Sequence, residues 1–303
     1  MATATVIPDK KDLANLALPA LITGAVAVGF SAIFVRLSEV GPIATAFWRM
    51  ALAFPAIWLW LRLERKRQTS PPRPTSRTDY LWLAGVGIFF TSDLVAWHLS
   101  INFTTVANSV LLANFAPIFV TVGGWLLFRQ RVSVTFVGGM LLALTGAAML
   151  VGASLQLSNQ RLLGDLLGLI TAIFYGGYIL SIKRIRGSLS TATVMAWAAA
   201  ITALLLLPLT LWWEDTLLPT SLYGWLVLLG LALVSHIGGQ GLVTFALAHL
   251  PASFLSVTLL LQPVLSTLFA WLLLDEILTP WQMIGGVVVL IGIFIARRAS
   301  RLS

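Results

Sequence analysis

Asp93 lies deep inside a long apolar segment, where a carboxyl group is costly and is usually retained for a function. At that depth it can bind the ammonium group of a solute, or take up and release a proton. The alternative is structural, because Arg49, His98 or His236 can pair with it, or it can lie in an outer vestibule. Trp97 follows Asp93 by four residues and therefore shares its face of a helix.

Two amide side chains stand shortly before prolines in other apolar segments, Asn114 before Pro117 and Gln262 before Pro263. Proline removes a backbone donor and weakens a helix, so each site can offer free carbonyl groups beside an amide. One interpretation is a solute-binding site over a bend; the other is an amide that repairs the bend locally. Ser256 is a further candidate for solute binding in the segment of Gln262, whereas the two prolines are predicted to be hinges.

His236 and Gln240 are four residues apart and share one face of a predicted helix. Histidine titrates near neutral pH, which makes His236 a second candidate for proton coupling as well as for solute binding. The alternative is a hydrogen-bonded histidine with a packing role. Gly238, Gly239 and Gly241 permit close backbone approach or bending, and we predict that they act as hinges.

Aromatic side chains are candidates for the lining of a solute pocket. Tyr175 and Tyr178 lie midway along one apolar segment, and Trp48 and Trp197 lie in two others. Aromatic linings suit apolar or aromatic solutes. Tryptophan in such segments can instead belong to the belts at the membrane surface or face lipid.

The segments that carry these residues are apolar enough to cross a bilayer. Hydrophobic residues make up 58% of the 303 residues, charged residues only 10%, and the mean hydropathy is +0.94. Soluble domains carry about 25% charged residues. Because backbone groups must be paired in hydrocarbon, each run should be a helix. We predict ten spanning helices at 13–36, 42–62, 79–101, 104–128, 132–152, 163–183, 190–213, 221–248, 251–274 and 279–296.

The basic residues predict the direction of these helices. If the N-terminus is cytoplasmic, all of the 19 Lys and Arg residues except Arg36, Arg49 and Arg161 fall on the cytoplasmic side. Such a bias predicts that both termini are cytoplasmic, in a multi-pass protein of a bacterial inner membrane. It also accounts for the net charge of +8 without nucleic-acid binding.

The second half of the chain repeats the first at a shift of 146 residues, which pairs Pro117 with Pro263, Gly139 with Gly285 and Gly146 with Gly292. Each copy holds five helices, an odd number, so the second copy enters the membrane from the opposite side. The domain boundaries that we predict are a cytoplasmic N-terminal tail at 1–12, a first repeat at 13–152, a linker at 153–162, a second repeat at 163–298 and a C-terminal tail at 299–303.

The end of the second repeat carries a pattern formed by Pro263, Trp271, Glu276, Thr279, Gln282, Gly285 and Gly292. This pattern resembles that of the drug/metabolite transporter superfamily, in its ten-helix EamA-type branch. In the first repeat Gln130 stands where Glu276 stands in the second, so the two repeats do not share this acid. The resemblance covers 13–298 and is greatest to bacterial exporters of aromatic and other amino acids. It implies an all-α membrane protein in which the third, fourth, eighth and ninth helices surround a central cavity.

Several function classes lack their motifs in this sequence. It has no HExxH, P-loop or GxSxG motif and no cysteine, so we expect neither an enzyme nor an ATP-driven pump, and no metal or cofactor. We expect a secondary transporter or facilitator that exports small amphipathic metabolites, above all amino acids including aromatic and apolar ones, by alternating access. Its partners would be this solute and the lipid bilayer, with no obligate protein partner. The alternatives are a proton-coupled exporter of cationic drugs that uses Asp93, and a channel.

Overall fold

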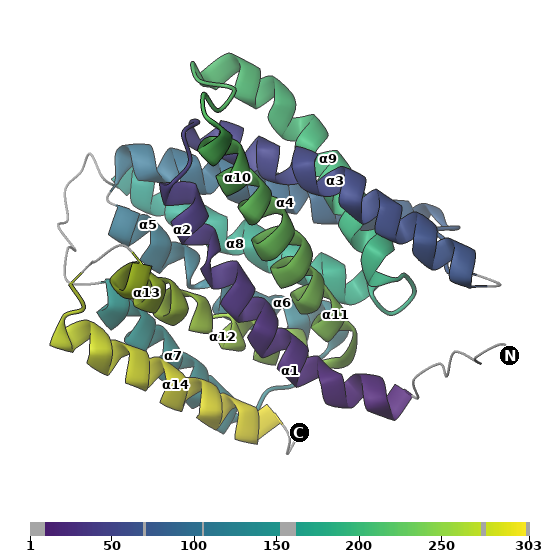
Figure 1. Ribbon diagram of the computed structural model, residues 1–303. Helices are drawn as coiled ribbons and strands as arrows, with labels where there is room; N and C mark the ends of the chain where they lie inside the picture. The colour runs from purple at the N-terminus through teal and green to yellow at the C-terminus, as the bar shows by residue number, and fades with distance from the viewer. Residues whose placement is uncertain (1–9, 69–70, 105, 152–161, 274–276, 301–303) are drawn as a thin grey trace, which may run out of the picture.

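The computed structural model describes residues 10–68, 71–104, 106–151, 162–273 and 277–300. All secondary structure in these ranges is helical, which confirms the predicted fold class (Figure 1). The predicted linker lies outside the described residues, apart from Leu162, as do 1–9 and 301–303 of the two predicted tails.

Five membrane-spanning segments form the first half of the chain, and two of them are interrupted. The first is divided at Phe30 and the fourth at Asn114 and Phe115. Their helices are α1 (Lys10–Gly29) with α2 (Ser31–Arg36), α3 (Pro42–Arg67), α4 (Arg77–Phe103), α5 (Val106–Ala113) with α6 (Ala116–Phe128), and α7 (Val134–Val151).

Five further segments form the second half. Its third segment contains a π-helix, η1, and its fourth is divided at Leu259 and Leu260. The helices are α8 (Leu162–Ile185), α9 (Thr191–Trp213), α10 (Leu222–Gly230) with η1 (Leu231–Gln240) and α11 (Gly241–His249), α12 (Ala252–Thr258) with α13 (Leu261–Leu273), and α14 (Pro280–Ser300).

Nine of the segments are long and apolar enough to cross a membrane by themselves, among the residues that the structure describes. The tenth, α7, has 18 residues and is apolar over Val134–Leu150. At about 1.5 Å per residue it measures roughly 27 Å, close to the thickness of about 30 Å of a bilayer core. The ten predicted segments are therefore all helical, and the chain is a multi-pass membrane protein.

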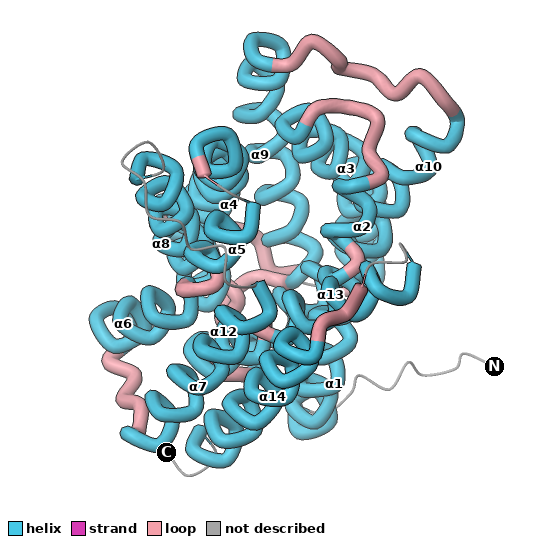
Figure 2. The backbone as a smooth tube through the Cα atoms, turned by 90° about the vertical axis from the view of Figure 1, so that its left-hand side faces the viewer, coloured by secondary structure: helices cyan, strands magenta, loops and turns pink. Residues whose placement is uncertain are grey.

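Equivalent helices of the two halves pack against each other in opposite directions. Gly139 of α7 faces Gly292 of α14, and Gly146 faces Gly285, so these two helices are antiparallel. They lie side by side in Figures 1 and 2. Likewise α3 packs on α9, and the packing of α4 on α8 is repeated by that of α11 on α1. This arrangement is that of two inverted five-helix repeats.

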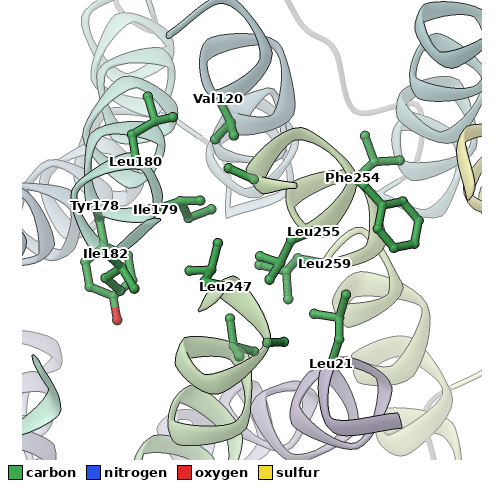
Figure 3. Close-up of a cluster of buried hydrophobic side chains, with 14 of the residues drawn as sticks. Leu21, Val120, Tyr178, Ile179, Leu180, Ile182, Leu247, Phe254, Leu255 and Leu259 are labelled. Carbon is green, nitrogen blue, oxygen red and sulfur yellow. The ribbon is translucent and has the colours of Figure 1, made fainter. Parts of the chain in front are cut away.

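A dense apolar cluster closes one side of the bundle. We call the side on which α1 begins and α14 ends the terminal side, and the other the far side (Figure 1). In the terminal half, Ile179, Leu247 and Leu255 point toward a common centre, with Leu21 and Leu259 beside them (Figure 3). These five side chains are at most 5% exposed, so they are closely packed at this level.

Two basic side chains tie α8 to α11 at the same side. Lys183 Nζ donates to the carbonyl oxygens of Leu247 at 3.0 Å and Leu250 at 2.9 Å, and Arg186 Nε donates to that of Thr244 at 3.1 Å. Burial lowers the pKa of Arg186 to about 10, so it stays charged at neutral pH. We call Lys183 and Arg186 the terminal clamp.

Carboxylates make the corresponding contacts on the far side. Glu214 Oε1 accepts from the backbone N–H of Ile43 at 2.8 Å, which joins the end of α9 to the start of α3. Glu39 accepts from Ser221 and Thr220 just before α10, and these hydrogen bonds, led by that of the Ser221 hydroxyl, lower the pKa of Glu39. Each contact places a negative charge at the start of a helix, where it is favoured.

Candidate functional site

Phe90 of α4 is the centre of an aromatic group that joins three spanning segments. Its ring stacks on that of Tyr178 in α8 at a centroid distance of 4.7 Å, and on His236 in η1 at 6.0 Å. Tyr178 in turn stacks on Tyr175 at 5.9 Å. The guanidinium of Arg49 in α3 lies 5.9 Å from the Phe90 ring, at the range of a cation–π contact. We call these five residues the Phe90 cluster.

Arg49 brings a positive charge into the middle of the protein. It is 9% exposed; its Nη1 donates to Ser31 Oγ at 3.4 Å, and its Nε has no hydrogen-bond partner. Arg49 and Asp93 act on each other electrostatically, but the two described side chains form no direct ion pair. Asp93 is only half-buried. The site therefore holds a basic and an acidic side chain that are not in direct contact.

Several polar atoms in the interrupted and π-helical segments are buried without a partner. Both ring nitrogens of His236, Oε1 of Gln240, Nε2 of Gln262 and Nδ2 of Asn114 make no hydrogen bond. The hydroxyl group of Tyr175 lies beside the amides of Gln240 and Gln262. Buried polar groups are normally paired, most strictly within a membrane. Their concentration here can bind a small solute that supplies both donors and acceptors.

Interrupted helices carry two of these amides. Asn114 lies in the break between α5 and α6, and Gln262 directly follows the start of α13. Pro117 and Pro263 each lie in the first turn of the helix that follows, where a missing N–H costs nothing. The breaks thus occur beside the prolines, as the sequence indicates; that the two residues act as hinges stays a prediction.

The π-helix η1 positions His236 and Gln240, and the sequence did not predict it. A π-helix is rare and occurs mostly at functional sites. Within η1, a Cβ on Gly239 would meet the backbone N of Val28 at 2.9 Å, so this glycine allows close approach of α1. Gly241 begins α11 and has open space around it, while Gly238 lies against its own helix. Hinge motion at the three glycines stays a prediction.

Two other candidates lie one turn or more from the cluster. Trp97 is half-buried, one turn after Asp93, and packs edge-on against His98. Ser256 is buried, and its hydroxyl donates to the carbonyl of Ser253 within the same turn at 2.8 Å. Its side chain is therefore already paired.

The structure does not bring Trp48 and Trp197 into contact with the Phe90 cluster. Trp48 Nε1 donates to the carbonyl of Leu217 in the far-side loop at 2.7 Å. Trp197 is 36% exposed and packs edge-on against Tyr80 at 5.7 Å. These positions are those of tryptophans near the membrane surface, and a binding role for either stays a prediction.

Phe90 and Ser31 are site residues that the sequence analysis did not single out. Arg49 appeared there only as a possible partner of Asp93. The signal for Arg49 was available, since it is a charge inside an apolar segment. Phe90 carries no comparable signal, because phenylalanine is common in any spanning helix.

Comparison with known proteins agrees with this arrangement. The sequence profile described as the EamA-like transporter family matches residues 15–152 and again 162–298. The pseudopaline exporter CntI of Pseudomonas aeruginosa is 25% identical over 215 residues, which cover 71% of this chain and 74% of that protein. A probable amino-acid metabolite efflux pump of Escherichia coli is 28% identical over 88% of this chain and 89% of its own length.

A second relative of the same description, from Salmonella typhimurium, is 29% identical over 91% of this chain and 94% of its own. One solved crystal structure superimposes with a TM-score of 0.79 over 95% of this chain and 99% of that chain, at 20% identity, which shows a shared fold. The two profile matches coincide with the two inverted five-helix repeats. The chain belongs to the EamA-like transporter family.

Proposed function

We propose that this protein is a secondary transporter or facilitator that exports small amphipathic metabolites, foremost amino acids with apolar or aromatic side chains. The observation that carries the proposal is the group of unpaired polar atoms beside the Phe90 cluster, midway through an otherwise apolar bundle. Amides and hydroxyl groups would hold the polar end of the solute, and the rings would contact its side chain. The relatives described as amino-acid metabolite efflux pumps support this class of solute.

The residues proposed to bind the solute directly come from five spanning segments. They are Asn114, Gln262, His236, Gln240, Tyr175 and Tyr178, with Trp97 at the edge. Asn114 and Gln262 lie beside helix interruptions, so a change in the bend at either interruption would move the amide that lies there. Alternating access would then occur by movement of α1, α3, α8 and α9 around it.

We propose that the terminal side is cytoplasmic and that the protein lies in a bacterial inner membrane. Most basic residues lie on this side, as the positive-inside rule requires. With this orientation, the apolar cluster and the terminal clamp close the path to the cytoplasm. The half-buried Asp93, Trp97 and Asn114 lie on the far side of that closure.

Counterflow in proteoliposomes tests the proposal. Vesicles that contain the purified protein are loaded with unlabelled phenylalanine, and uptake of labelled phenylalanine is compared with that of empty vesicles. Unlabelled amino acids and cationic drugs are then tested as competitors of the uptake of labelled phenylalanine. We expect apolar amino acids to compete best. Absence of counterflow for every solute contradicts transport, and a steady ionic current without a bound solute supports a channel.

A second candidate function is proton-coupled export of cationic drugs, which the position of the half-buried Asp93 near the site favours. The variant Asp93→Asn distinguishes the two. For an amino-acid facilitator, we expect phenylalanine counterflow without a pH gradient to persist in this variant within about tenfold of the wild-type rate. For a proton-coupled drug exporter, drug flux driven by a pH gradient should be abolished.

A further inference from the structure

Arg49 is a buried guanidinium whose charge no neighbouring carboxylate neutralises. Glu39 and Glu214 bind backbone N–H groups at the far-side surface, and Asp93 makes no direct ion pair with Arg49. Among the residues that the structure describes, the only hydrogen bond of the guanidinium is the one that Nη1 donates to the neutral hydroxyl of Ser31. The elements packed around it contribute Phe90, Tyr178 and His236, none of which is an anion at neutral pH.

A charge in this position is costly unless something compensates it. Removing a guanidinium from water is unfavourable, and proteins retain unpaired buried charges mainly where they serve a function. An arginine presents a planar fork of donors that matches a carboxylate in two parallel hydrogen bonds. The unpartnered Nε of Arg49 is one arm of such a fork.

We infer that Arg49 binds the carboxylate of the transported solute, while Asp93 faces its ammonium group. The site would then select α-amino carboxylates over amines, amides and other cations of the same shape. This inference rests on the proposed transport function and names the solute class more closely.

The geometry gives each part of an amino acid a place. Arg49 of α3 and the half-buried Asp93 of α4 influence each other electrostatically and form no direct ion pair, so each can face one end of a zwitterion. Phe90 lies against the guanidinium at 5.9 Å and continues into the ring stack of Tyr178 and Tyr175. An apolar or aromatic side chain can pack on these rings.

Matched analogues test the inference on the wild-type protein, with no need for a variant. Labelled phenylalanine counterflow is inhibited with unlabelled phenylalanine, phenylalaninamide, which lacks the carboxylate, and 3-phenylpropionate, which lacks the ammonium group. We expect phenylalaninamide to inhibit about ten- to a hundredfold more weakly than phenylalanine, because a charge-assisted hydrogen-bond pair is lost. Equal inhibition by phenylalanine and phenylalaninamide would overturn the inference.

The variant Arg49→Gln tests whether Arg49 causes the preference for phenylalanine over phenylalaninamide. The matched control is Arg62→Gln, which removes a charge from the exposed end of the same helix, where Arg62 lies over Trp58. We expect Arg49→Gln to lose the preference for phenylalanine over phenylalaninamide, Arg49→Lys to keep part of it, and Arg62→Gln to keep all of it. A folded Arg49→Gln protein that retains the full preference overturns the inference.

The outcomes separate this inference from the function on which it rests. If no amino acid or drug shows counterflow, transport itself is contradicted. If phenylalanine is transported but its amide competes equally, transport stands and the role of Arg49 is contradicted. Thermal unfolding in detergent identifies variants that fail to fold, and the analogue series on the wild-type protein decides in that case.

Discussion

At the scale of single residues, the site depends on one ring that touches three partners. Phe90 contacts Tyr178, His236 and Arg49, and it is 3% exposed. These partners come from α8, η1 and α3, so the ring fixes the mutual position of three segments. A change at Phe90 should therefore alter the binding of solute as well as the stability of the protein.

The prediction at this scale is the effect of Phe90→Leu. Loss of the ring contacts should raise the KM for phenylalanine counterflow about two- to tenfold, since aromatic pairs contribute about 0.5–1.5 kcal/mol each. Phe136→Leu is the control, because Phe136 of α7 is similarly buried, at 2% exposure, but stacks on no ring among the described residues. It should lower thermal stability by a similar amount and leave KM unchanged. Equal effects of the two variants on KM would contradict the role of Phe90.

The sequence predicts the polar residues of the site better than the aromatic ones. A charge or amide inside an apolar segment is detectable without a structure, and this rule finds Asp93, His236 and Gln262. Trp48 and Trp197 were also expected to line a pocket, but they do not contact the Phe90 cluster. Their indole groups are equally suited to the membrane surface, so the sequence does not distinguish the two positions. Which aromatic side chains point into the bundle depends on packing among helices that are far apart in the sequence.

At the scale of elements, the ends of the helices follow from local chemistry, but their internal geometry does not. Ser76 with Asp79 forms a capping box that begins α4, and Ser190 caps α9. The breaks beside Pro117 and Pro263 are also predictable. The π-helix η1 is not, because a wider turn is stabilised by the neighbours against which it packs, here α1 and α3.

Adjacent glycines in α7 provide the prediction at this scale. A Cβ on Gly139 would lie 2.6 Å from the backbone N of Ala296 in α14, whereas one on Gly138 would meet no atom within 4 Å. Gly139→Ala should force α7 and α14 apart and lower the free energy of unfolding by about 1–3 kcal/mol. Gly138→Ala should be neutral or slightly stabilising, since alanine favours a helix. Thermal unfolding in detergent measures both, and equal stability of the two variants would contradict this packing.

At the scale of the whole molecule, the described apolar side chains are closely packed in the terminal half, whereas Asp93, Trp97 and Asn114 lie in the far half of their segments. The apolar cluster of Figure 3 and the terminal clamp both belong to the half in which α8 meets α11 and α12. Alternating access requires this half to open, so the clamp should contribute to the balance between the two states. The fold and the number of segments followed from the sequence, but the state in which the protein rests did not.

Removing the terminal clamp should shift this balance. In the double variant Lys183→Ala/Arg186→Ala, we expect the apolar cluster to open more often, because charge-assisted hydrogen bonds contribute about 1.5–3 kcal/mol each. The chain has no cysteine, so a thiol introduced by Leu255→Cys can be labelled alone. Its labelling rate from the terminal side should rise at least about tenfold. The control Lys66→Ala/Arg67→Ala, at the exposed end of α3, should not change it, and an unchanged rate in a folded clamp variant would contradict the proposal.

The two faces of the protein are held together by groups of opposite sign, and this gives them different responses to acid. Glu39 has a pKa below its ordinary value of 4.5 in the folded protein, so its bonds to the start of α10 persist above that pH and weaken as the pH falls through its lowered pKa. Lys183 and Arg186 carry their charge throughout that range. If the far side faces the exterior, an acidic environment outside the cell weakens only the contacts of Glu39. The contacts of the terminal clamp, on the cytoplasmic side, then remain intact.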